Sequence, residues 1–147
     1  EINEPGALDG TIFYRDYDGD GFGDPFESEM LCEAGDITYY DATDNSDCCD
    51  WDAGANPSAS SARTIPNVCG DYDWNCDGDE TRSLTQMGDC GWEFSLDSCS
   101  AEPEGWESSI PDCGEEEDWI RNCEVTYSWG IPSCNREVTT PETQPCL

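Results

Sequence analysis

The sequence predicts a small, disulfide-rich fold made mostly of irregular loops, with short antiparallel β-strands and little helix. Eleven of its 147 residues are cysteine. Leu, Ile, Val and Phe are scarce, so we do not expect a large aliphatic core. Small domains with this composition are held together by disulfides and bound metal ions instead.

The net charge of −30 limits the classes of partner. All five cations are arginine, and the chain has no lysine and no histidine. A chain this acidic repels phosphate backbones and anionic lipid surfaces, so we expect no nucleic-acid binding. No apolar run approaches the ~20 residues that a membrane span needs, so we expect no membrane insertion.

The density of cysteine indicates an oxidising compartment. The chain begins at Glu1 and carries no charged-then-apolar signal segment. We therefore expect a mature secreted protein, extracellular or at the cell surface.

The first element is an exposed N-terminal arm and strand, residues 1–13. Residues 1–10 are polar and contain Pro5 and Gly6, which is typical of an exposed arm. Thr11 to Tyr14 reads as a strand that leads into the next segment. Residues 26–32 are expected to form one helical turn that delivers Cys32.

The loop from Asp16 to Glu27 has the full EF-hand ligand spacing. Gly21 stands at position six, where the loop must turn sharply. Calcium takes six to eight oxygen ligands, and clustered aspartates repel one another unless a cation lies among them. Gly23 occupies position eight, usually aliphatic, and the preceding strand argues against a helix–loop–helix switch. The expected calcium ligands are Asp16, Asp18, Asp20, Asp24, Glu27 and the carbonyl of Phe22.

Two further acidic clusters complete a calcium-binding module over residues 14–86. The first offers Asp47, Asp50 and Asp52 at ligand spacing, without a glycine at the turning position. The second begins at Asp73 and has Gly78 at position six, but its position twelve is Leu84. Its expected ligands are Asp73, Asn75, Asp77 and Asp79, with Glu80 as a substitute. For each cluster the alternative is a solvated acidic loop.

Residues 14–80 resemble the MopE-type metal-binding repeat of secreted bacterial proteins. The matching pieces, in order, are Asp18 to Asp24, Cys32, Asp47-Cys48, Asn56-Pro57, Cys69-Gly70, Cys76-Asp77-Gly78 and Asp79-Glu80. The resemblance implies an extracellular calcium-binding module, similar to thrombospondin type-three repeats, and suggests the pairs Cys32–Cys48 and Cys69–Cys76. The chain departs from the family at Cys49, where an aspartate is usual. The family name suggests copper, but a chain without histidine offers copper few suitable ligands.

Residues 87–147 form a cysteine-rich disulfide module. Six cysteines, from Cys90 to Cys146, can close three bridges, and Asp89-Cys90-Gly91 recurs as Asp112-Cys113-Gly114. Residues 119–146 resemble in part a thrombospondin type-one repeat, which implies stacked tryptophan and arginine side chains, here with Arg121 and Arg136. The alternative is that the aromatic side chains fill gaps in a small disulfide core.

The odd number of cysteines leaves one over, and we expect it to be Cys49. It would be a free thiol, a link to a cofactor or a bond to another chain. A bridge between the adjacent Cys48 and Cys49 is possible but strained.

No catalytic set is visible, because histidine and lysine are absent and the acids cluster at metal-ligand spacing. We therefore expect a non-enzymatic protein. The leading hypothesis is a calcium-binding subunit that self-associates into an extracellular surface layer, appendage or filament, with the N-terminal arm available for strand addition. The alternative is a calcium-dependent adhesin that binds carbohydrate through exposed tryptophans.

Overall fold

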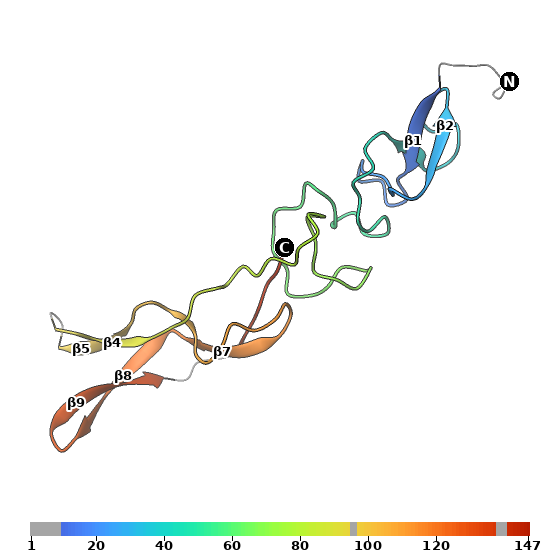
Figure 1. Cartoon of the computed structure of the whole chain (residues 1–147). Helices are drawn as coiled ribbons and strands as arrows, with labels where there is room; N and C mark the ends of the chain where they lie inside the picture. The colour runs from blue at the N-terminus through green and yellow to red at the C-terminus, as the bar shows by residue number, and fades with distance from the viewer. Residues whose placement is uncertain (1–9, 95–96, 138–140) are drawn as a thin grey trace. The chain divides into compact units, whose positions relative to one another are not determined.

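The computed structural model describes residues 10–94, 97–137 and 141–147, and these ranges contain short strands and no helix (Figure 1). Within the described ranges the strands pair antiparallel in four small sheets, and Met87 makes an isolated parallel bridge with Trp106. The predicted fold class is confirmed. The strands are β1 (Thr11–Arg15), β2 (Ser28–Leu31), β3 (Tyr40–Ala42), β4 (Cys90–Glu93), β5 (Ser98–Ala101), β6 (Gly105–Trp106), β7 (Glu116–Ile120), β8 (Asn122–Ser128), β9 (Ile131–Glu137) and β10 (Pro141–Thr143).

The chain forms two compact units. Unit 1 runs to Thr81 and also includes Leu147, and unit 2 is Arg82–Cys146. The boundary predicted from the sequence lies between residues 86 and 87. Residues 1–9 of the predicted arm lie outside the described residues. No helix in the described part of the chain has the length and hydropathy needed to cross a membrane.

Unit 1 begins with a three-stranded sheet in the order β2-β1-β3. The predicted strand from Thr11 to Tyr14 is confirmed as β1, which continues to Arg15. The predicted helical turn over residues 26–32 is wrong, because Ser28–Leu31 pairs with β1 as β2. The ladder satisfies backbone groups of both strands, which a single helical turn would leave unpaired.

The rest of unit 1 is built on disulfides around Trp74. Trp74 is buried with Cys49 and Ala55, and Leu147 packs against this cluster. The guanidinium of Arg63 lies 3.7 Å from the centre of the Trp74 ring. This stacking supplies contact area that aliphatic side chains provide in larger cores.

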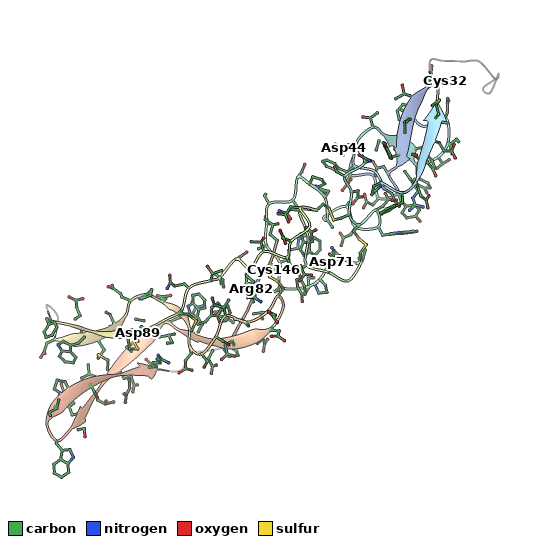
Figure 2. All side chains as sticks on the ribbon, viewed as in Figure 1. Cys32, Asp44, Asp71, Arg82, Asp89 and Cys146 are labelled. Carbon is green, nitrogen blue, oxygen red and sulfur yellow. A yellow bond between two sulfur atoms is a disulfide. The ribbon has the colours of Figure 1, made fainter. Side chains whose placement is uncertain are left out.

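The disulfides of unit 1 differ from the suggested pairs. The bridges are Cys48–Cys76 and Cys49–Cys69. The unpaired residue is Cys32, which is exposed and follows β2 directly (Figure 2). The suggested pairs Cys32–Cys48 and Cys69–Cys76 and the expected free thiol at Cys49 are therefore wrong. Cys49 is 2% exposed, and burial inside the unit favours a structural bridge there.

Unit 2 contains β4–β10 and three bridges, as its six cysteines predict. They join Cys90 to Cys123, Cys99 to Cys134 and Cys113 to Cys146. At its centre the fully buried Trp106 packs edge-on against Trp119, with ring centroids 4.9 Å apart. The indole N–H of Trp106 donates to the Leu84 carbonyl at 2.7 Å, which satisfies the buried polar atom.

Among the residues of this unit that the structure describes, the expected stacking of tryptophan and arginine side chains does not form. Arg121 pairs with Glu142, and Arg136 lies 3.8 Å from a carboxylate oxygen of Glu107. In the described residues, arginine lies over tryptophan only at Trp51 and Trp74, both in unit 1. The acidic surroundings offer each arginine a carboxylate, and a direct ion pair competes with the aromatic face.

The hairpin β8–β9 ends in a two-residue turn. Ser128 pairs with Ile131, and the residues between them, Trp129 and Gly130, have φ values of 54° and 79°. Two positive φ values match a type I′ turn, whose twist suits a hairpin and which usually contains Asn-Gly. Here a fully exposed tryptophan stands at the first turn position.

Candidate metal centre

The loop after β1 is folded around the carboxylate of Asp16. Its Oδ1 accepts the backbone N–H groups of Gly19 at 2.7 Å and Asp20 at 3.1 Å, and its Oδ2 accepts that of Gly21 at 3.0 Å. Gly21 has a φ of 97°, which glycine adopts without steric cost. The turning position predicted from the sequence therefore has the expected conformation.

Three carboxylates of this loop converge. Oxygens of Asp16, Asp18 and Asp20 lie within 4.8 Å of one another. Two oxygens bound to one calcium ion at about 2.3–2.6 Å lie at most about 5 Å apart, so the spacing fits a shared ion. The Oδ2 atoms of Asp18 and Asp20 are buried and have no hydrogen-bond partner in the structure. Burial and then the neighbouring charge of Asp20 raise the pKa of Asp18 to about 6. This group can hold a metal ion.

Asp47, from the second acidic cluster, lies close to the same loop. Asp47 is 3% exposed; its Oδ1 accepts the N–H of Cys49 at 2.7 Å, and its Oδ2 is buried without a partner. Burial raises the pKa of Asp47 to about 7, and the charges of Asp20 and Asp18 add to the rise. An oxygen of Asp47 also lies within 4.8 Å of the sulfurs of Cys48 and Cys76, but these form a disulfide and offer no thiolate.

Arg15 binds three of the other predicted ligands. Its guanidinium lies 2.7 Å from Glu27, 2.7 Å from Asp50 and 3.3 Å from Asp24. Asp50 also accepts the N–H of Tyr17 at 2.7 Å, and Asp24 accepts that of Phe26 at 2.7 Å. The hydrogen bond and charge of Asp50 raise the pKa of Arg15, so the cation remains protonated.

The remaining predicted residues of these two clusters have local roles. Asp52 accepts the N–H groups of Gly54 and Val68, both at 3.2 Å. The half-buried Phe22 donates its N–H to Asp20 at 2.9 Å. Asp47, Asp50 and Asp52 thus have different partners and do not converge into a site of their own.

The third predicted cluster repeats the hydrogen bonding of the first loop. Asp73 accepts the N–H groups of Asp77 at 3.1 Å and Gly78 at 2.9 Å, as Asp16 does at the same spacings. Asn75 donates to Asp77 at 2.8 Å, while its own Oδ1 is buried without a partner. Asp79 donates its N–H to Asp77 at 2.9 Å. The loop shape is shared, but its carboxylates do not form a tight group like that of Asp16, Asp18 and Asp20.

The donor atoms limit which ions the first loop could hold. They are carboxylate oxygens, which suit hard divalent cations such as calcium, magnesium or manganese and not copper. Every arginine of the chain contacts a carboxylate or an aromatic ring, so the described residues offer no free cation to an anionic ligand. The site is therefore suited to a cation.

The chain matches no family model, no curated protein and no solved structure.

Ligand spacing alone missed the role of Arg15. The sequence did contain an indication of this role. Acidic residues outnumber cations 35 to 5, so an arginine directly before an acidic loop is expected to form ion pairs with its carboxylates.

Proposed function

We propose that this chain is a secreted, calcium-binding structural protein in which calcium stabilises unit 1. The observation that carries the proposal is the set of buried, unpartnered carboxylate oxygens on Asp18, Asp20 and Asp47. A buried oxygen without a partner costs about 1–3 kcal/mol, and more when it is charged. A bound divalent cation offsets this cost and the repulsion between the carboxylates.

The rest of unit 1 supports the same proposal. It has a small buried cluster and two disulfides, so little apolar burial opposes the conformational entropy of ~1–2 kcal/mol per residue. Extracellular fluids keep calcium near millimolar levels, and affinities of about 10⁻⁴ to 10⁻³ M suffice for extracellular modules. Disulfides persist in the same compartments.

Calcium titration calorimetry tests the site. Asp18→Ala or Asp20→Ala removes a ligand and a charge and should weaken calcium binding in the first loop. Asp41→Ala is the matched control, since Asp41 is an exposed aspartate of β3 outside the loop. Unchanged titrations of Asp18→Ala and Asp20→Ala, or equal weakening in all three variants, would contradict the site.

We further propose that two copies associate through the β8–β9 hairpin of unit 2, as in a subunit of a surface layer, appendage or filament. No residue from 125 to 135 is charged, although the chain has a net charge of −30. Tyr127 and Ile131 are each 69% exposed and Trp129 is 100% exposed. Next to them, Trp92, Phe94, Ile131 and Pro132 line a shallow groove, and Phe94 is 91% exposed. Uncharged surface is where two acidic copies approach with least repulsion.

The area of this patch suits a pair of copies. Large aromatic side chains bury about 150–250 Å² each, so the exposed ones here offer roughly 500–700 Å² per copy. A standard interface buries about 800 Å² per partner. Single exposed apolar residues need no explanation, but several of them on one uncharged hairpin, beside an apolar groove, favour an interaction site.

Sedimentation velocity at millimolar calcium tests the association. The wild type should sediment faster than a monomer, and Trp129→Ala should return it to the monomer. Phe26→Ala is the matched control, because Phe26 is 93% exposed but belongs to unit 1. A monomeric wild type would overturn the proposal. If that monomer binds neutral polysaccharides and loses them in Trp129→Ala, the adhesin alternative takes its place.

A further inference from the structure

The first calcium loop packs directly against residues 44–47. The N–H of Gly23 donates to the carbonyl of Asp44 at 2.9 Å, and the N–H of Asp47 donates to the carbonyl of Gly23 at 3.3 Å. A β-carbon on Gly23 would lie 2.5 Å from that of Tyr14 and 3.0 Å from the Asp44 carbonyl oxygen. Glycine at position eight of the loop is therefore needed for this close backbone approach.

The approach buries Asp47 beside the acidic loop. Its Oδ1 is fixed by the N–H of Cys49, while the buried Oδ2 has no partner. Asp47 is 3% exposed, and its backbone contact with Gly23 holds it against the loop that carries Asp18 and Asp20, whose Oδ2 atoms are also buried without a partner. The other carboxylates near this region are Asp16, Asp18 and Asp20 of the loop, whose oxygens lie within 4.8 Å of one another, and Asp50, which accepts the N–H of Tyr17 at 2.7 Å.

The residue at position twelve of the loop is engaged elsewhere. Glu27 binds Arg15 at 2.7 Å and lies 3.4 Å from the hydroxyl of Tyr40. Asp24, at position nine, also binds Arg15. Freeing either carboxylate for an ion would break a contact with a guanidinium that a third carboxylate, Asp50, holds in place.

We propose that Asp47, and not Glu27, is the closing carboxylate of the calcium site formed by Asp16, Asp18 and Asp20. The inference rests on the proposed function, since it names a ligand of the same ion. The site is then shared by two segments, and the ion joins the loop after β1 to the residues that precede Cys48 and Cys49. Gly23 and Arg15 are positioning residues. Gly23, without a side chain, lets the backbone of residues 44–47 pack against the loop, and Arg15 holds the Glu27 carboxylate in an ion pair.

Calorimetric calcium titration of four variants tests the assignment. Asp47→Asn keeps an oxygen that accepts the Cys49 N–H and loses one charge, and it should weaken binding at least about tenfold. Glu27→Gln loses the same charge at position twelve and should change affinity less than about threefold. Asp44→Asn, an exposed aspartate of the same segment, controls for the loss of charge near the site and should also change little. Gly23→Ala changes no charge and should weaken binding by displacing Asp47.

Hydrogen exchange provides a readout that does not depend on affinity. Calcium should slow amide exchange at residues 44–49 as well as 16–21 in the wild type, but only at residues 16–21 in Asp47→Asn. Strong weakening by Glu27→Gln with an unaffected Asp47→Asn would overturn the inference while leaving the calcium site in place. A wild type that binds no calcium would overturn the proposed function itself, so the two failures are distinguishable.

Discussion

Replacing Trp129 by asparagine should make the β8–β9 hairpin more stable while preventing the copies from associating. A non-glycine residue with positive φ costs about 1–2 kcal/mol, and asparagine tolerates that conformation far better than tryptophan does. Trp129 has a φ of 54° and is 100% exposed, so its replacement loses no packing within the chain. We expect a gain of about 1 kcal/mol, which corresponds to about fivefold slower exchange of the hairpin amides.

Two comparisons separate the effect of the backbone strain on stability from the effect of the aromatic ring on association. Trp129→Ala removes the ring and keeps a side chain with positive φ, so association should be lost without a gain in stability. Gly130→Ala adds strain at a φ of 79° and should destabilise the hairpin. At protein concentrations low enough for the wild type to be monomeric, calorimetry of wild-type, Asn and Ala variants should show a rise of about 4–8 °C in the unit 2 transition for the Asn variant alone. A lower transition, or faster exchange, in Trp129→Asn would refute the reasoning.

Three further outcomes follow from the carboxylates and cysteines of unit 1. Burial raises the pKa values of Asp18 and Asp47 to about 6 and about 7, above the ordinary ~3.9 of an unfolded aspartate. Between these pH values the folded metal-free unit therefore binds more protons than the unfolded chain does. Urea unfolding of the chelated protein, with Cys32 alkylated, should therefore show stability falling as pH rises from about 4 to 7, and a flat or rising profile would contradict the burial of these groups. Alkylation of the native protein followed by peptide mapping should label one thiol, at Cys32, and label found instead at Cys49 would contradict the bridges given above. Limited proteolysis after chelation should cleave the chain between residues 10 and 81 and leave a fragment held by the three bridges of unit 2. Those disulfides restrict the unfolded chain without help from metal. Equal cleavage of both units would contradict calcium as the stabiliser of unit 1.

The general character of the fold was predictable because composition limits it. A chain rich in cysteine and poor in aliphatic residues favours small sheets joined by bridges, and the β-branched and aromatic run from Thr11 to Tyr14 identified β1. The stretch Ser28–Leu31 was misjudged because a short segment next to a turn has no clear period, and only its partner β1 makes it a strand.

The candidate site was predictable only where it is local. Asp16, Asp18 and Asp20 converge because a tight turn at Gly21 brings alternate residues together. Cysteine pairing and the partners of Glu27 depend on which distant segments meet, and ligand spacing contains no information about that. The sequence shows that Gly23 replaces the aliphatic residue usual at position eight of the loop. Only the structure explains the glycine, because the backbone of Asp44 packs closely against it.

The position of Leu147 affects the order in which the chain can fold. Thr81 and Leu147 exchange two backbone hydrogen bonds, at 2.9 and 3.0 Å, and Leu147 packs against the buried cluster of Cys49, Ala55 and Trp74. A chain that emerges from its N-terminus during synthesis or export delivers residue 147 only after all of residues 82–146. Unit 1 therefore begins to fold before unit 2 but completes its fold only when residue 147 is present. A substitution at residue 147 should lower the stability of unit 1, whose other residues all precede Arg82.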